Sequence, residues 1–305
     1  MIQDIFPKVF DNHYDSEAIA FDDDIVLVFN NDEIMIGDAT SVGGGAADVN
    51  MSEGEDASKT IACFPRVSDL INVDNTELRY LFAIDEKRFF LLQKCVAAPV
   101  GFSYQKFRTL RERNYRDSKD MVFAAFTAYQ LNEWYAVTRY CGRCGALNED
   151  DKSERARVCP ECGNKIYPRI NPAVIIGITD KETDRIILTK YRTGFGHNAL
   201  VAGFTEIGET LEGTVAREAM EEVGLKVTNI RYYKSQPWGI ASDILAGFFC
   251  DVEGDPAIKM DSSELKYAEW VAPEDIVLQP VDYSLTNEMM RLFKEKGYEG
   301  TLGRV

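Results

Sequence analysis

Residues Gly203–Leu225 read GFTEIGETLEGTVAREAMEEVGL. They fill every fixed position of the pattern G-x5-E-x7-R-E-U-x-E-E-x-G-U, in which U is an apolar residue. Helix signals agree with this pattern, because Glu209 or Thr210 can cap a helix start and Gly224 can end the helix in a left-handed conformation. The segment therefore predicts a loop followed by a helix that carries a dense set of glutamates.

The glutamates of this helix are expected to form a cation site. Glu218, Glu221 and Glu222 project from one arc, since residues three and four apart are neighbours on a helix. Carboxylates this close repel one another, so a cation should lie among them, and oxygen ligands suit Mg²⁺ or Mn²⁺. Arg217 can orient a carboxylate through a bidentate contact. The alternative is a solvated acidic helix face. The apolar residues share another broad face: Val215, Ala216, Ala219, Met220 and Val223.

Composition limits the classes of protein that need to be considered. The chain has 305 residues, enough for two or three domains, and 45% of them are hydrophobic, as in ordinary globular proteins. It has no apolar run of the roughly 18 residues that span a bilayer, and its first residues lack the features of a signal peptide. We therefore expect a cytoplasmic protein that does not enter a membrane.

The charge of the chain bears on its partners. A net charge of −16 argues against broad binding to nucleic-acid backbones, so no DNA partner is expected. A single phosphate-bearing terminus is still compatible with this charge, because bound metal ions reverse the charge locally.

Four of the seven cysteines form two C-x-x-C pairs, Cys141–Cys144 and Cys159–Cys162, separated by fourteen residues. Four thiolates at this spacing can close a tetrahedral Zn²⁺ site, which is the arrangement of a zinc ribbon. A redox pair would normally stand alone, and disulfides are rare in the cytoplasm. The spacing therefore predicts one structural zinc ion, which would fold this segment rather than catalyse a reaction.

The chain divides into three predicted domains. The first, residues 1–135, is β-rich, with hairpins over 24–37 and 77–93, a Gly-, Ala-, Ser- and acid-rich loop over 41–59, and an amphipathic helix over 116–134 that leads into the ribbon. The ribbon takes residues 136–170. Residues 171–305 are predicted to form a mixed α/β domain with a closing helix, and its strands are expected near 173–179, 185–190, 199–204, 227–234, 244–252 and 267–271.

The glutamate signature resembles that of the Nudix hydrolases, which cleave a diphosphate bond that joins a nucleoside to another group. Together with the ribbon and Ser235-Gln236-Pro237-Trp238, it resembles the NADH pyrophosphatases within that family. The resemblance implies an αβα sandwich with a mixed sheet. It also implies hydrolysis of NAD(H) to nicotinamide mononucleotide and AMP, removal of an NAD cap from the 5′ end of RNA, and a homodimer. The cofactors implied are two or three Mg²⁺ or Mn²⁺ ions beside the zinc.

The resemblance also implies roles for individual residues. The metal ligands would be Glu218, Glu221, Glu222, Glu264 and the backbone carbonyl of Ala202. The catalytic set would hold Arg217, Glu221, Glu222 and Glu264, with either Glu222 or Glu264 as the general base. Contacts to the substrate would come from Glu154, Tyr167, Phe204, Gln236, Pro237, Trp238, Gly239, Ile240, Ala241, Ser242 and Asp243. For the two aromatic residues Tyr167 and Phe204, ordinary core packing is the alternative.

The chain departs from the resemblance after Trp238. The usual element reads S-Q-P-W-P-F-P-x-S, whereas this chain continues with residues 239–243, GIASD. Because proline fixes φ, the loop without its prolines should be less rigid. It also lacks an aromatic side chain and gains the carboxyl group of Asp243. This departure supports one alternative, hydrolysis of another nucleoside diphosphate such as ADP-ribose. A non-enzymatic role as a ligand-sensing regulator is a separate alternative, against which the intact glutamate set argues.

Overall fold

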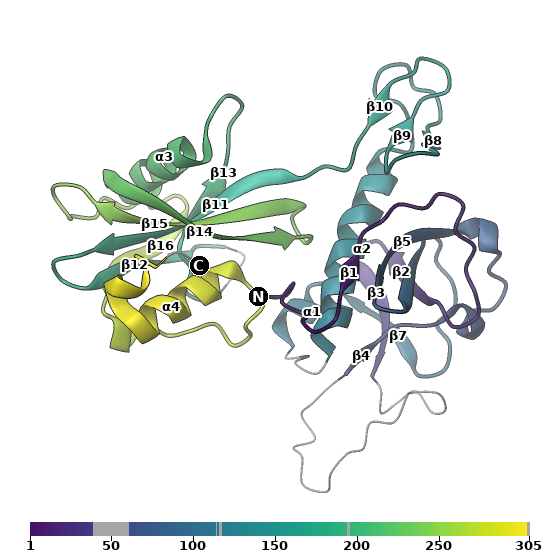
Figure 1. Ribbon diagram of the computed structural model, residues 1–305, viewed down its shortest axis with the longest axis horizontal. Coiled ribbons are helices and arrows are strands. Elements are labelled where there is room, and N and C mark those ends of the chain that lie inside the picture. The colour runs from purple at the N-terminus through teal and green to yellow at the C-terminus, as the bar shows by residue number, and fades with distance from the viewer. Residues whose placement is uncertain (39–60, 114, 116–117, 194–195, 304–305) are drawn as a thin grey trace, which may run out of the picture. The chain divides into compact units, whose positions relative to one another are not determined.

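The computed structural model describes residues 1–38, 61–113, 115, 118–193 and 196–303. It divides into two compact units (Figure 1). One holds residues 2–169 with 239–241, and the other holds Met1 with residues 170–238 and 242–305. The loop predicted for residues 41–59 lies outside the described part of the chain. Among the described residues, no helix combines the length and the apolar character needed to cross a bilayer.

The N-terminal unit is built on a β-sheet whose described strands run in the order β1-β5-β6-β2-β3-β4, with β7 paired to β3. Both predicted hairpins are present, and the parallel pairing of β2 with β6 joins them into one sheet. The strands are β1 (Phe10–Asp11), β2 (Ile25–Asn30), β3 (Glu33–Asp38), β4 (Ala62–Cys63), β5 (Leu78–Ile84), β6 (Lys87–Leu92) and β7 (Phe102–Lys106). Short helical segments accompany them: η1 (Val67–Asp69), η2 (Asn75–Glu77) and α1 (Thr109–Glu112).

Helix α2 (Lys119–Val137) packs on this sheet through aromatic side chains. The ring of Phe123 lies 5.1 Å from that of Phe10, and Tyr129 stacks on Phe107 at 4.1 Å. The predicted amphipathic pattern is wrong, because four consecutive residues, 122–125, are all buried. Consecutive helical residues point about 100° apart, so α2 is enclosed on most sides rather than half-solvated.

The segment predicted to be a zinc ribbon follows α2 directly. Its three short strands, β8 (Glu149–Asp150), β9 (Arg157–Val158) and β10 (Lys165–Ile166), pair in the order β10-β9-β8. Gly145 and Gly163 each follow a C-x-x-C pair and have φ of +79° and +69°. A residue without a Cβ is favoured at such angles, so each pair sits at a tight turn.

The second unit contains a mixed sheet in the order β14-β15-β11-β12-β16, with β13 also paired to β11 among the described strands. Strand β11 pairs in parallel with β15 and antiparallel with β12 and β13. The strands are β11 (Asn171–Asp180), β12 (Arg185–Tyr191), β13 (Val201–Phe204), β14 (Val227–Trp238), β15 (Asp243–Val252) and β16 (Leu265–Val271); the short helix η4 (Pro273–Asp275) follows.

Helices cover both faces of this sheet (Figure 1). Alternate residues of a strand point to opposite faces. Phe248 of β15 joins the core cluster that includes Val215 and Val223 of helix α3 (Leu211–Val223). A Cβ built on its neighbour Gly247 would instead lie 2.8 Å from Met289 of helix α4 (Leu285–Gly300). The unit is therefore the predicted αβα sandwich.

Helix α3 has the predicted boundaries. The hydroxyl of Thr210 accepts a hydrogen bond from the backbone N–H of Gly213, and Gly224 ends the helix with φ of +71°. The predicted apolar face is partly wrong, because Ala216 and Met220 are exposed while Thr214 and Glu222 are buried. The buried stripe is thus rotated so that one glutamate points inward.

Candidate active site and zinc site

Arg217 binds three carboxylates, one before α3 and two in its second half. Its guanidinium donates two hydrogen bonds to the carboxylate of Glu209, at 2.7 and 3.0 Å. The same group donates to Glu218 at 2.7 Å and to Glu221 at 2.8 Å. It also donates to the backbone carbonyl of Phe204 at 2.9 Å. One arginine therefore ties the loop before the helix to two of the predicted metal ligands.

The charges in this network shift one another's pKa values. The Arg217 guanidinium, followed by the backbone N–H of Glu206, lowers the pKa of Glu209 to about 2. The hydrogen bond from Arg217 to Glu209 in turn raises the pKa of the guanidinium. Both groups stay charged at every ordinary pH, so the network can act as a fixed scaffold.

Glu218 packs directly on the backbone of Gly203. A Cβ added at Gly203 would lie 2.0 Å from the carboxyl carbon of Glu218, a distance that real Cβ atoms do not show. Gly203 lies in β13, opposite Val174 of β11. A side chain at residue 203 would therefore push the Glu218 carboxylate away from the position that it holds here.

Glu222 is the buried carboxylate of the site, with only 3% of its surface exposed. The hydroxyl of Tyr191, the last residue of β12, donates to its Oε1 at 3.3 Å. Its Oε2 is buried without a hydrogen-bond partner. Burial first, and then the charges of Glu218 and Glu264, raise the pKa of Glu222 to about 8, whereas Tyr191 and the backbone N–H of Ala202 act to lower it.

Glu264 lies just before β16 and is exposed. Its backbone carbonyl accepts a hydrogen bond of 3.0 Å from the N–H of Arg192, which fixes it beside the end of β12. Burial is the largest cause that raises the pKa of Glu218, and the charges of Glu221 and Glu264 add to it. The structure thus brings Glu218, Glu222 and Glu264 into one repulsive field beside Ala202.

This field fits a divalent cation. An orphaned carboxylate oxygen inside the protein is costly unless a cation or donor meets it, and oxygen-only ligands match Mg²⁺ or Mn²⁺. Among the described residues, however, the glutamates are not drawn together as closely as the cysteines are. Arg217 binds Glu218 and Glu221, whereas Glu222 binds Tyr191. Different residues therefore hold the predicted metal ligands in place: Arg217 holds Glu218 and Glu221, and Tyr191 holds Glu222.

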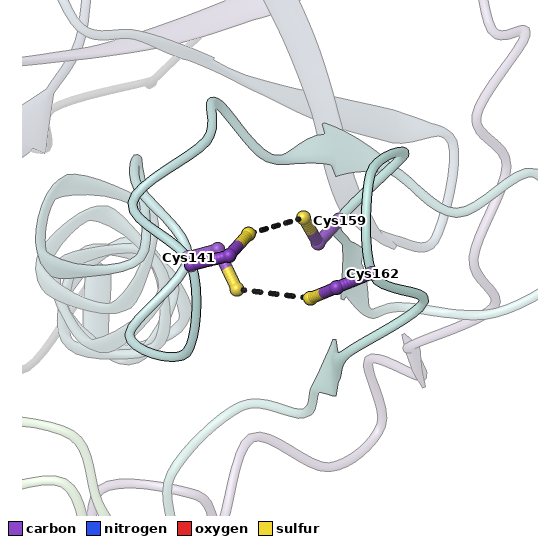
Figure 2. A group of neighbouring side chains, drawn as sticks. Cys141, Cys159 and Cys162 are labelled. Carbon is purple, nitrogen blue, oxygen red and sulfur yellow. Dashed lines mark hydrogen bonds between the residues drawn. The ribbon is translucent and has the colours of Figure 1, made fainter.

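The four cysteines converge at the ribbon. Their sulfur atoms all lie within 4.8 Å of one another, with Cys141–Cys162 at 3.7 Å and Cys144–Cys159 at 3.4 Å. Figure 2 shows Cys141, Cys159 and Cys162 pointing toward one another from two loops. Four sulfurs about 2.3 Å from a tetrahedral Zn²⁺ would be about 3.8 Å apart. The cluster therefore fits zinc.

The cysteine thiols and nearby backbone N–H groups shift one another's pKa values in opposite directions. Backbone N–H groups, that of Arg143 foremost, lower the pKa of Cys141 to about 6. The pKa of Cys144 is raised to about 12, where hydrogen bonds with Cys159 and Cys162 outweigh the lowering by the backbone N–H of Ala146. Zinc binds thiolates, so its binding would release protons from these thiols.

Two predicted substrate contacts lie in the N-terminal unit. Tyr167 is 54% exposed, and its hydroxyl donates to the carboxylate of Glu154 at 3.2 Å. Lys165 binds the same carboxylate at 2.6 Å. Exposure of this ring argues against the core-packing alternative for Tyr167.

The predicted contacts in the other unit differ in accessibility. Phe204, at the end of β13, is 54% exposed, so it too is not a core residue, whereas Trp238 is buried. Gln236 is fully buried: its amide donates to the carbonyl of Tyr283 at 2.7 Å and accepts from the N–H of Leu285 at 2.6 Å. Its side chain therefore joins β14 to α4 and is not available to a ligand in this structure.

The segment that departs from the resemblance, residues 239–243, is mostly enclosed. Gly239, Ser242 and Asp243 are buried, Ile240 is partly buried and Ala241 is exposed; Pro237, in the element before it, is also exposed. Asp243 does not present a free negative charge to solvent, because it is 6% exposed and lies 3.4 Å from the side-chain amide of Asn171. Ser242 adopts φ of +62°, in the left-handed region.

Tyr191 and Thr214 were not predicted as parts of the site. Tyr191 reaches Glu222 across 31 residues of sequence through the sheet, and no local pattern signals such a contact. The hydroxyl of Thr214 donates to Oε2 of Glu209 at 3.0 Å. The sequence signal that could have predicted this contact is the position of Thr214, five residues after Glu209 and on the inward side of the helix.

Two known proteins are similar to about half of this chain. NAD-capped RNA hydrolase NudC from Enterobacter sp. (strain 638) is 42% identical over 153 residues, which is 50% of this chain and 58% of that protein. NAD-capped RNA hydrolase NudC from Shigella dysenteriae serotype 1 (strain Sd197) is 39% identical over 165 residues, which is 53% of this chain and 62% of that protein. The match thus spans less than two thirds of each relative's length.

Among solved structures, a NUDIX hydrolase from Nitrosomonas europaea matches with a TM-score of 0.45 and 22% identity, over 54% of this chain and 94% of that chain. Residues 169–293 match the NUDIX domain, and residues 137–167 match the NADH pyrophosphatase zinc ribbon domain. The chain therefore carries a NUDIX domain preceded by an NADH pyrophosphatase zinc ribbon domain, as its glutamate signature and its paired cysteines predict.

Proposed function

We propose that this chain hydrolyses the diphosphate bond of NAD(H) to nicotinamide mononucleotide and AMP, and that it also removes the NAD cap from RNA. The observation that carries the proposal is the buried carboxylate of Glu222, which has an unpartnered oxygen beside two further glutamates in a NUDIX domain. The zinc ribbon and the names of the two relatives support the choice of substrate.

The proposed chemistry assigns a task to each residue. Glu218, Glu222, Glu264, Glu221 and the carbonyl of Ala202 would hold two or three Mg²⁺ or Mn²⁺ ions. When bound, these ions supply charge neutralisation at the diphosphate and lower the pKa of water. Glu222 or Glu264 would accept the proton of the attacking water. Arg217 would orient the carboxylates of Glu218 and Glu221 through its hydrogen bonds to them.

The substrate's rings are proposed to meet exposed aromatic residues. Phe204 precedes the signature helix, and Tyr167 follows the zinc cysteines, and each is half-exposed. Stacking of a base on such a ring contributes about 1–3 kcal/mol in proteins that bind single strands. A homodimer belongs to this proposal as well.

The experiment that tests the activity is hydrolysis of a substrate panel by the zinc-loaded chain with Mg²⁺ or with Mn²⁺. The panel holds NADH, NAD⁺, ADP-ribose and diadenosine polyphosphates, and mass spectrometry identifies the products. We expect the highest kcat/KM for NADH or NAD⁺, with nicotinamide mononucleotide and AMP as products. Absence of turnover on every member would instead favour a ligand-sensing regulator.

Hydrolysis of another nucleoside diphosphate is the second candidate, and the sequence of residues 239–243 favours it. The segment lacks the prolines and the phenylalanine of the usual element. A kcat/KM for ADP-ribose above that for NADH would select this candidate.

Cap removal is tested separately with NAD-capped RNA. Release of nicotinamide mononucleotide from the RNA, at a rate that equimolar free NADH does not suppress, would show that RNA is the preferred substrate. Complete suppression would show that the free dinucleotide is preferred.

A further inference from the structure

A cavity lies within the N-terminal unit, and neither the site glutamates nor the zinc cysteines line it. It has a volume of about 560 Å³, which falls within the range of small-molecule sites. Its walls come from strands of the N-terminal sheet, from α2 and from the ribbon. Among the described residues that line it, three are arginines and none is acidic, although the whole chain carries a net charge of −16.

One carboxylate behind the wall is shared by two of these arginines. Arg79 donates to Oδ2 of Asp150 at 2.9 and 3.0 Å, and Arg157 pairs with Oδ1 of the same residue. The third arginine, Arg139, is exposed and lies over the ring of Tyr140, and no ion pair joins it to a carboxylate of the described residues. The cavity wall therefore keeps an excess of positive charge.

Two deeply buried side chains of the lining have unsatisfied atoms. Arg157 is 8% exposed and Asn148 is 3% exposed. Nε of Arg157 and Oδ1 of Asn148 have no hydrogen-bond partner. Burying an unpaired polar atom costs about 1–3 kcal/mol. A ligand that offers an acceptor to Nε of Arg157 and a donor to Oδ1 of Asn148 would remove this cost.

We propose that this cavity binds a phosphorylated ribose, as found in a nucleoside monophosphate. Phosphate oxygens are the acceptors that guanidinium groups bind best, and sugar hydroxyls are donors that can meet an amide oxygen. Hydrogen bonds hold the amide side chains of the cavity wall in place. Gln93 accepts a hydrogen bond from Arg79 at 3.0 Å and donates one to Asn132 at 3.2 Å. The guanidinium carbon of Arg79 lies over the ring of Tyr135, 4.0 Å from the ring centre, and this contact helps to hold the guanidinium in place.

The test is calorimetric titration of the full zinc-loaded chain without Mg²⁺ or Mn²⁺. The probes are ribose 5-phosphate, AMP, inorganic phosphate and adenosine. We expect one ribose 5-phosphate and one AMP per chain, weaker binding of phosphate, and no binding of adenosine. The absence of saturable binding by either ribose phosphate at millimolar concentration would overturn the proposal.

Two variants test whether AMP binds in this cavity. Arg139→Ala removes an exposed cation from the wall and should weaken AMP binding about tenfold, the loss of one good contact. Gln93→Glu adds a carboxylate of equal size beside Arg79 and should weaken it at least as much. Arg108→Ala, at an exposed arginine of the same unit outside this lining, is the matched control and should leave binding unchanged.

A further variant separates this cavity from the glutamate site. Binding of AMP that survives in Arg139→Ala and Gln93→Glu but is lost in Glu222→Gln would show that the ligand sits among the glutamates, and it would overturn the proposal. Circular dichroism and zinc content confirm that each variant is folded.

Discussion

The hydroxyl of Tyr191 donates to Oε1 of Glu222 at 3.3 Å and so joins the end of β12 to the inward side of the signature helix. This contact supports the one glutamate that is buried at 3% exposure. It leaves Oε2 of Glu222 without a protein partner. The same carboxylate is thus oriented on one side and open to a cation on the other.

Removing the charge of Glu222 tests its role directly. Glu222→Gln keeps the shape but lacks the anionic oxygen, so kcat should fall at least about 10²-fold, the lower end of the contribution of a general base. Steady-state kinetics on NADH at saturating Mg²⁺ measures this. Glu212→Gln, on the exposed first turn of the same helix, is the control that should keep normal turnover. A Glu222→Gln variant with near-normal kcat would rule out the proposed role.

Removing the hydroxyl of Tyr191 should shift the pH profile. The hydrogen bond favours the charged form of Glu222, so Tyr191→Phe raises the pKa of that carboxyl further above its ordinary range. The acidic limb of kcat/KM should therefore move to higher pH, and Mn²⁺ should bind more weakly near neutral pH when its affinity is measured by electron paramagnetic resonance. Tyr232→Phe, an exposed tyrosine of β14, should change neither. Identical profiles for Tyr191→Phe and the unaltered chain would contradict the assignment.

The pH dependence of stability follows from the same carboxyl. The folded pKa of Glu222 is about 8, above its ordinary value of 4.5. Between these values the folded chain holds a proton that the unfolded chain has released, so the free energy of unfolding falls as pH rises, by at most about 1.4 kcal/mol per pH unit. Urea unfolding of the Mg²⁺-free chain between about pH 5 and pH 8 measures the slope. Glu222→Gln should flatten it, and a slope that is the same in both proteins would refute the link.

A methyl group at residue 203 should disturb Glu218. The Cβ of Gly203→Ala would lie 2.0 Å from the Glu218 carboxyl, so the carboxylate must move away from β13. Because the side chain is long and partly exposed, we expect turnover to fall at least tenfold while thermal stability changes little. Gly196→Ala, whose added Cβ meets nothing within 4 Å, is the matched control. Normal activity in Gly203→Ala would show that the position of Glu218 is not critical.

Loss of one zinc ligand should unfold the ribbon. Cys159 is buried among the four sulfurs, and a structural zinc site contributes directly to folding. Cys159→Ser should therefore reduce zinc from one ion per chain to almost none, as measured by plasma mass spectrometry, and should expose the ribbon to proteolysis. Cys95→Ser, at an exposed cysteine outside the cluster, should retain its zinc. Full zinc content in Cys159→Ser would contradict the four-cysteine site.

Local sequence signals set the elements and the chemistry of their side chains. Thr210 and Gly224 mark the two ends of α3 because capping depends on residues within one helical turn. The two C-x-x-C pairs predict a metal site because two tight turns can bring four cysteine sulfurs within a few ångströms of one another. Both hairpins of the N-terminal unit were likewise predictable from alternating apolar strands and short polar turns.

Contacts between distant segments could not be predicted in this way. The apolar pattern of α3 suggested that Met220 would be buried, yet Met220 is 43% exposed and Glu222 takes an inward position. Gln236 belongs to a motif expected to contact substrate, but its amide group is hydrogen-bonded to Tyr283, just before α4, and to Leu285, the first residue of α4. Each of these outcomes depends on which element packs beside the residue.

The sequence by itself determined that this protein has a glutamate helix, a four-cysteine ribbon and a β-rich first region, because caps, spacing and alternation act over a few residues. Only the tertiary structure decided which glutamate is buried, that Tyr191 supports it, and that Gly203 makes room for Glu218. The reason is physical: desolvation and close packing arise when strands distant in sequence come together, and they set the pKa of a carboxyl that composition alone leaves at its ordinary value.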